Sequence, residues 1–101
     1  MYYRGTTPLH TFELPTEIFP IKTVKITYRQ KDKEVLVKRT EDCTIEEGKI
    51  TTRLSQEDTF RFEALTFVSM QLRVLTECGD ALTSEPITIS VGKCLDDEVL
   101  A

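Results

Sequence analysis

The sequence contains no tryptophan, one histidine, four glycines and three widely spaced cysteines in 101 residues. A structural zinc site needs about four nitrogen or sulfur ligands, and the chain has neither a paired-cysteine motif nor a second histidine. Nucleophilic catalysis needs a base within reach of the nucleophile, but His10 shares a strand-like face with Phe12 and Leu14, which indicates a partly buried structural residue. No glycine-rich phosphate loop is present. We therefore expect a non-enzyme with no catalytic residue, metal site or cofactor.

The sequence also lacks segments that direct proteins to membranes. Its hydrophobic runs are far shorter than the roughly 18 residues needed to cross a bilayer, and no apolar secretory signal follows Met1. We therefore expect no membrane contact and a reducing compartment. In such a compartment Cys43, Cys78 and Cys94 are expected to be free thiols.

Charge is distributed unevenly along the chain. Seven basic and two acidic residues between Lys22 and Arg39 give a net charge of +5, whereas six basic and fifteen acidic residues elsewhere give −9. Nucleic-acid binding is not expected, because this segment has one aromatic residue and the whole chain is acidic. The segment is either a solvated hairpin face or a docking surface for an acidic partner, including another copy of the chain. The residues of this predicted basic patch are Lys25, Arg29, Lys31, Lys33 and Lys38.

Strand periodicity is the main structural feature that is present. In Phe67–Thr76, apolar residues alternate with polar ones, which predicts a strand with one buried and one solvated face. A turn with a glycine follows at Glu77–Asp80, and the alternation resumes at Pro86–Val91. We expect these two strands to form the hairpin on which the earlier strands pack. Its inward residues are predicted to be Val68, Met70, Leu72 and Val74.

Shorter alternating segments precede this hairpin, and turn residues separate them. Ser55 is a good helix N-cap followed by acidic residues, which predicts one helical turn at 55–59 crossing between two sheets. Phe60, Phe62 and Leu65 are expected to fill the core beneath it. The expected strands are Leu9–Leu14, Lys22–Arg29, Glu34–Arg39, Cys43–Ile45 and Ile50–Leu54.

About seven short strands with frequent turns predict an all-β, immunoglobulin-like β-sandwich. A small barrel is the alternative. We expect a single domain over 1–101, with a loose N-terminal lead-in at 1–8 and an acidic C-terminal tail at 93–101.

Several short motifs follow one another in a characteristic order along the chain. They are Arg4-Gly5-Thr6-Thr7-Pro8, His10, Phe12, Leu14, Pro15, Val24–Tyr28, Leu54–Thr59, Gln71–Thr76, Leu82, Ser84, Ser90-Val91 and Leu95–Leu100. In these motifs the sequence resembles small prophage proteins of Gram-positive bacteria. Their order is similar to that of the immunoglobulin-like N-terminal domain of phage baseplate upper proteins, which are receptor-binding adaptors.

The resemblance covers nearly the whole chain and implies a structural role in a phage particle or its tail. It supplies no catalytic residues, and without the adaptors' C-terminal extension we do not expect direct contact with a host receptor. We expect a tail- or baseplate-associated component, located in the virion or in the host cytoplasm before assembly. Its partners would be other phage structural proteins or further copies. The alternative is a small cytoplasmic binding or regulatory domain, such as an inhibitor of a host enzyme.

Overall fold

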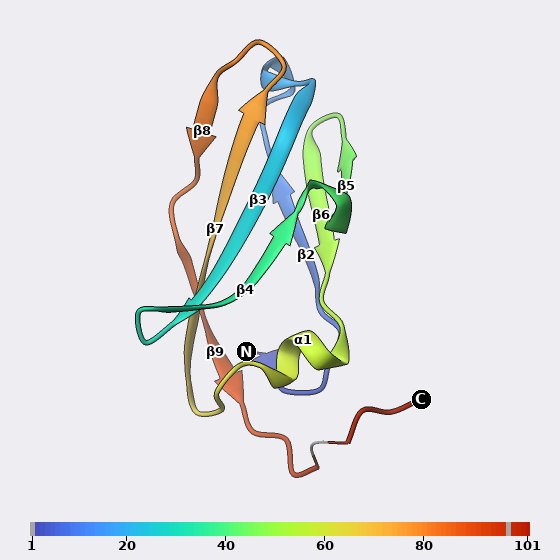
Figure 1. The fold of residues 1–101 in the computed structure, drawn as a ribbon, viewed down its shortest axis with the longest axis vertical. Coiled ribbons are helices and arrows are strands. Elements are labelled where there is room, and N and C mark those ends of the chain that lie inside the picture. Colours follow the sequence, from blue (N-terminus) through green and yellow to red (C-terminus); the bar gives the residue numbers. More distant parts are fainter. Residues whose placement is uncertain (1, 97) are drawn as a thin grey trace.

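The computed structural model describes residues 2–96 and 98–101, which form an immunoglobulin-like sandwich of two β-sheets (Figure 1). The six-stranded sheet follows the order β1-β9-β7-β3-β4, and β8 also pairs with β7. The three-stranded sheet follows the order β2-β6-β5. The predicted all-β sandwich is therefore confirmed, with nine strands in place of about seven.

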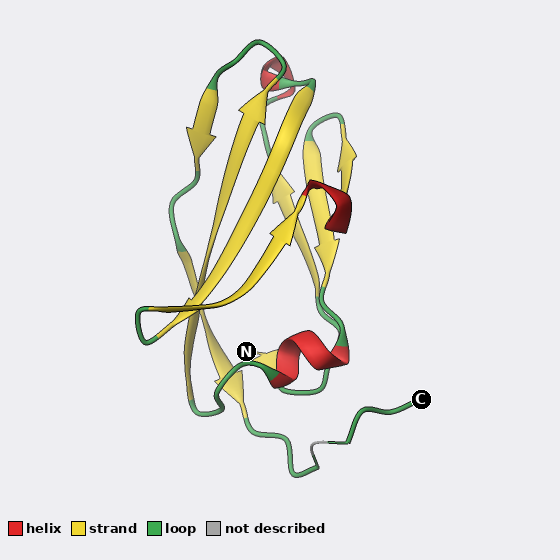
Figure 2. Cartoon of the chain, in the orientation of Figure 1, coloured by secondary structure: helices red, strands yellow, loops and turns green. Residues whose placement is uncertain are grey.

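The strands are β1 (Tyr2–Tyr3), β2 (Leu9–Glu13), β3 (Ile21–Gln30), β4 (Lys33–Arg39), β5 (Cys43–Glu46), β6 (Lys49–Arg53), β7 (Thr66–Thr76), β8 (Ala81–Thr83) and β9 (Ile87–Gly92). Three short helical segments connect them (Figure 2), namely η1 (Thr16–Ile18), η2 (Thr40–Asp42) and α1 (Gln56–Phe60).

Helix α1 carries the chain from the smaller sheet to the larger one, as predicted. The Ser55 hydroxyl accepts a hydrogen bond from the Asp58 N–H at 3.1 Å, and the Asp58 carboxylate accepts one from the Ser55 N–H at 2.9 Å. This reciprocal capping box satisfies two amide groups that a helix start leaves without partners.

Strand β7 is central in the larger sheet, which confirms the prediction for Phe67–Thr76. It pairs with β3 on one side and with both β8 and β9 on the other. The returning strand is interrupted between β8 and β9, where the Ser84 hydroxyl accepts the Leu72 N–H at 3.0 Å. Pro86 follows this break, and proline has no N–H to donate to a sheet. The buried face of β7 is the predicted one, formed by Val68, Met70, Leu72 and Val74.

The residues that follow α1 depart in part from the prediction. Phe62 is 1% exposed and fills the core, whereas Phe60 is half-buried. The expectation that Leu65 also fills the core was wrong, because its side chain is 81% exposed. Leu65 adopts a left-handed backbone conformation with φ of 63° just before β7 begins, and its N–H donates to the Val91 carbonyl at 2.8 Å. Leu65 therefore lies in a turn just before the alternation of β7, and its side chain is exposed on the surface, like that of Phe67.

A column of aromatic rings joins the two sheets through the core. The His10 ring stacks on Tyr2 with 4.8 Å between centroids, and its Nδ1 lies 2.7 Å from the Tyr28 hydroxyl. Tyr28 in turn contacts Phe62 at 5.9 Å. Burial lowers the pKa of His10 from 6.5 to about 4 and raises that of Tyr2 to about 12. His10 is therefore a buried structural residue, as the sequence indicated.

The N-terminal lead-in is ordered against α1 over residues 2–6, where a loose segment was expected. Strand β1 pairs in parallel with β9, placing Tyr2 beside Val91. The Gly5 N–H donates to the hydroxyl of the buried Thr59 at 2.9 Å. Gly5 has φ of 83°, and a Cβ there would lie 2.8 Å from the Phe60 ring. Glycine is therefore required for this close approach.

Candidate interaction surface

Three cations lie side by side on the outer face of the larger sheet, which points away from the core. Lys25 on β3 is paired with Arg39 on β4 and with Arg73 on β7. Directly opposed residues share a face, and adjacent strands are roughly 4.8 Å apart. Arg39, Lys25 and Arg73 therefore form a continuous line across three strands, here called the outer cation row.

Within residues 2–96 and 98–101, no ion pair neutralises a member of the outer cation row. The ion pairs found there join Lys31 to Glu63, Lys38 to Asp58 and Lys49 to Glu46. Like charges directly opposite each other destabilise a sheet, so this arrangement opposes folding. An anionic partner would remove that repulsion, which makes the row a candidate binding site.

The outer cation row borders a concavity of about 280 Å³. Its remaining walls are mostly aliphatic and come from β7 and β8, including Leu75, Ala81 and the 41%-exposed Leu82. A neighbouring concavity of about 440 Å³ shares Arg73 and contains Arg29 together with Glu34. The surface thus combines positive charge with apolar contact area.

The five residues of the predicted basic patch do not form one surface. Lys25 and the exposed Arg29 share the outer face. Lys31 lies at the hairpin turn, 3.3 Å from the Glu63 carboxylate. Lys33 is exposed but opposes the buried Gln30, so it belongs to the core side of the ribbon.

Lys38 also departs from the predicted basic patch, because it opposes the buried Ile26 and points toward α1. Its ammonium group lies 2.7 Å from the Asp58 carboxylate, and both side chains are 15% exposed. Burial alone would raise the pKa of Asp58, but hydrogen bonds from Lys38 and Ser55 lower it below its ordinary value. Lys38 therefore anchors α1 to the sheet.

Sequence reasoning did not place Arg73 in the basic patch, and it counted Arg39 only as part of the basic segment. Both residues join Lys25 through strand register, which pairs segments far apart in the chain. The alternation in β7 already placed Arg73 on the solvated face. The alternation does not indicate that β7 pairs with β3, and only this pairing places Arg73 beside Lys25.

A second candidate surface is apolar and lies at the other end of the larger sheet. Tyr3, Leu65 and Phe67, here called the apolar cluster, are 54%, 81% and 63% exposed. Together with the end of β9 they line a concavity of about 410 Å³. Leu36 on β4 is 5% exposed in the core and contributes to neither surface.

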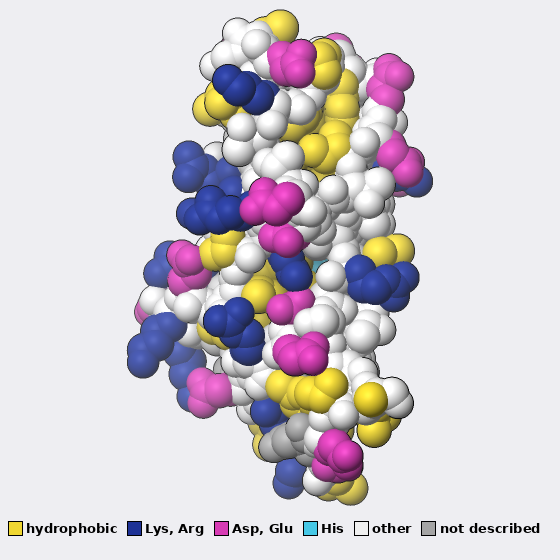
Figure 3. Space-filling model, turned by 45° about the vertical axis from the view of Figure 1, so that its right-hand side comes forward, with side chains coloured by type: hydrophobic (Ala, Val, Ile, Leu, Met, Phe, Trp, Pro, Cys, Tyr) yellow, Lys and Arg dark blue, Asp and Glu magenta, His cyan; other side chains and the backbone are white. Residues whose placement is uncertain are grey.

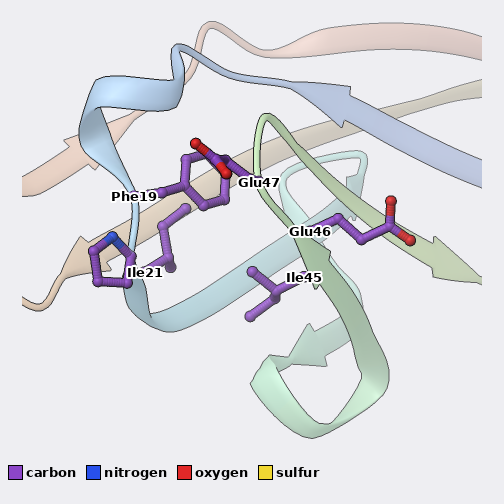
Figure 4. A pocket seen from close by; sticks show the side chains of 6 residues that line it. Phe19, Ile21, Ile45, Glu46 and Glu47 are labelled. Carbon is purple, nitrogen blue, oxygen red and sulfur yellow. The ribbon is translucent and has the colours of Figure 1, made fainter.

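A third hollow of about 440 Å³ lies between the start of β3 and the β5–β6 turn (Figure 4). Phe19, Ile21 and Ile45 form its apolar walls, with Glu46 and Glu47 beside them. Figure 4 shows the Glu46 side chain directed away from Phe19 and Ile21, and its carboxylate lies 3.4 Å from the Lys49 ammonium. The hollow thus combines apolar walls with two carboxylates, one of which pairs with a lysine.

Figure 3 shows many Lys and Arg side chains in the left half of the view and others at its centre and right edge, with Asp and Glu side chains interspersed among them. Within the described residues, no group of three or more His, Cys, Asp or Glu side chains could hold a metal ion. Cys43, Cys78 and Cys94 are free thiols. In the same part of the chain, no helix is long and apolar enough to span a membrane.

No protein-family model matches the sequence, and no curated protein matches it significantly.

Proposed function

We propose that the chain is a non-enzymatic structural component of a phage or prophage particle, associated with the tail or baseplate, that acts through protein–protein contacts. The apolar cluster carries this proposal. Contiguous exposed apolar side chains on a small domain typically mark a site of protein interaction. Leu65 is especially informative, because a branched residue at positive φ is uncommon and this one is 81% exposed.

The sequence motifs, whose order is similar to that in phage baseplate proteins, support the proposal that the particle is a phage or prophage. One of them, Arg4-Gly5-Thr6-Thr7-Pro8, fixes the lead-in against α1 and thereby places Tyr3 beside the end of β9. The motif thus helps to build the apolar cluster. This connects the resemblance to a surface that can bind another protein.

The test is to induce the prophage in the strain that carries this gene and to purify particles on a density gradient. Mass spectrometry of the particle band should detect the chain at a fixed ratio to known tail proteins. Recovery only from the free protein fraction, with particles intact, would contradict the proposal. It would favour the small cytoplasmic regulatory domain, as would flanking genes unrelated to tails, baseplates or lysis.

The same assay can test the apolar cluster itself. Phe67→Ser should reduce incorporation into particles, because it removes an aromatic anchor without touching the core. Leu9→Ser is the matched control, since Leu9 is 53% exposed but lies on the smaller sheet. Equal incorporation of both variants would show that the apolar cluster is not the contact.

A further inference from the structure

We propose that the outer cation row binds the acidic tail, residues 93–101, of a second copy of the chain. The inference rests on the proposed function, because it names a partner for a domain that acts by protein contact. It uses a surface separate from the apolar cluster. It therefore assigns a self-association site in addition to a contact with other particle proteins.

The chemistry of the concavity favours an acidic peptide over a phosphate or a nucleic acid. Three cations meet aliphatic walls from Leu75, Ala81 and Leu82, so the best ligand carries both carboxylates and apolar side chains. Nucleic acid would place a dense negative charge against a chain whose own net charge is −4.

The acidic tail has that composition. It reads Lys93-Cys94-Leu95-Asp96-Asp97-Glu98-Val99-Leu100-Ala101, with three consecutive acids between apolar residues. Leu95 and Leu100 are 94% and 70% exposed, so both leucines are available to another surface. Three carboxylates would match the three cations of the outer cation row.

The geometry of the chain points to a neighbouring copy. The described part of the tail, residues 93–96 and 98–101, lies at the end of the sandwich that carries α1, opposite the β7–β8 turn (Figure 1). There the Gln56 side-chain amide donates to the Leu100 carbonyl at 2.9 Å and accepts the Leu100 N–H at 2.8 Å. The outer cation row lies next to β8, where Arg73 pairs with Thr83. A contact between such different surfaces is heterologous, so it closes a ring or extends a filament.

The test measures binding of a fluorescein-labelled peptide of residues 93–101 by fluorescence anisotropy. The wild-type protein should bind it, and Arg73→Glu should weaken binding at least about tenfold because it reverses one partner of a charge-assisted contact. Raising the salt from about 0.05 to 0.5 M should also weaken binding, since the Debye length falls from roughly 14 to 4 Å. Thermal melts must show that each variant is folded.

Lys33→Glu is the matched control, because it makes the same charge change in the same sheet, at the start of β4 and outside the outer cation row. It should leave peptide binding within about twofold of wild type. A peptide with the three acids changed to lysine should bind Arg73→Glu better than wild type. In the full chain, Gln56→Ala should increase self-association seen by sedimentation, because it releases the tail.

Three results would overturn the inference. They are no peptide binding by wild type, equal loss in Arg73→Glu and Lys33→Glu, and retained binding of a peptide whose acids are replaced by Asn and Gln. Binding of inorganic pyrophosphate but not of the peptide would assign the site to phosphate instead. A chain that is incorporated into particles yet fails to bind the peptide would leave the proposed function standing without this contact.

Discussion

Lys25 and Lys38 lie on adjacent strands of one hairpin, but their electrostatic surroundings are opposite. Lys38 faces the core side and contacts the Asp58 carboxylate at 2.7 Å. Lys25 faces outward and is flanked by Arg39 and Arg73 across both neighbouring strands. The core side of the hairpin thus pairs its cation with an anion, whereas its outer side holds like charges directly opposite one another, at a cost to stability.

The core side and the outer side of the sheet should differ most in the loss of stability that a substitution in β7 causes. Leu72→Asp should lower the free energy of unfolding by more than about 4 kcal/mol, because it buries an unpaired charge in the core. Gln71→Asp, one residue earlier on the outer face, should cost at most about 1 kcal/mol for the lost hydrogen bond to the Ser84 carbonyl. Thermal and urea unfolding of both variants measure the difference. Similar small effects would contradict the assignment of faces.

The core side should also be sensitive to acid. Burial lowers the pKa of His10 from 6.5 to about 4, so between these values the unfolded chain binds more protons than the folded one. The free energy of unfolding should therefore fall by about 3 kcal/mol as the pH drops from 6.5 to 4.

Urea unfolding at several pH values between 7.5 and 4 would measure this loss. His10→Gln is the control, because it retains a polar group near Tyr28 but has no titration in this window. The wild type should lose more stability than the variant over the same range. Parallel pH profiles would mean that His10 does not carry the effect.

Removing a lysine should have different consequences on the two faces. Lys38→Met should lower the free energy of unfolding by about 2 kcal/mol, because it leaves the Asp58 carboxylate partly buried without its cation. Lys25→Met should be neutral or slightly stabilising. Adding Asp58→Asn to Lys38→Met should recover part of the loss, and a failure to do so would argue against the ion pair as the cause.

The smallest expected effect has the opposite sign. Lys25→Glu should raise the free energy of unfolding by about 0.5–1 kcal/mol, since it replaces two repulsive cross-strand pairs with attractive ones. High salt should reduce the gain. Urea unfolding of the variant at low and high salt provides the measurement. A destabilised Lys25→Glu would indicate that carboxylates elsewhere already neutralise the outer cation row.

The main features of the fold could be predicted because its strands have one buried and one solvated face. This pattern located β3 and β7 and assigned the inward side chains, including Tyr28 and Leu72. It could not predict the exposure of Leu65, because this residue lies before β7 in a left-handed turn, outside the alternating segment. The alternating pattern also could not predict β1, because a strand of two residues is too short to show an alternation.

The candidate site was harder to predict than the fold. The net charge of the segment identified a basic hairpin. In the structure, however, its cations lie in three different places: on the outer face, on the core side and at the turn. Lys38 looked like a surface residue because its partner, Asp58, lies on a helix that follows two further strands. The outer cation row depends on Arg73, and only the pairing of β7 with β3 brings it to Lys25.

The parallel pairing of β1 with β9 joins the two extremes of the chain, with Tyr2 opposite Val91. During synthesis, Tyr2 and Tyr3 are made long before their partner strand β9, because most of the domain separates them in sequence. Contacts between such distant segments form slowly, because a large loop must close. The apolar cluster, which needs Tyr3 beside the end of β9, is therefore assembled only after translation of the domain is almost complete. A half-made domain would therefore not yet present the apolar cluster as one surface.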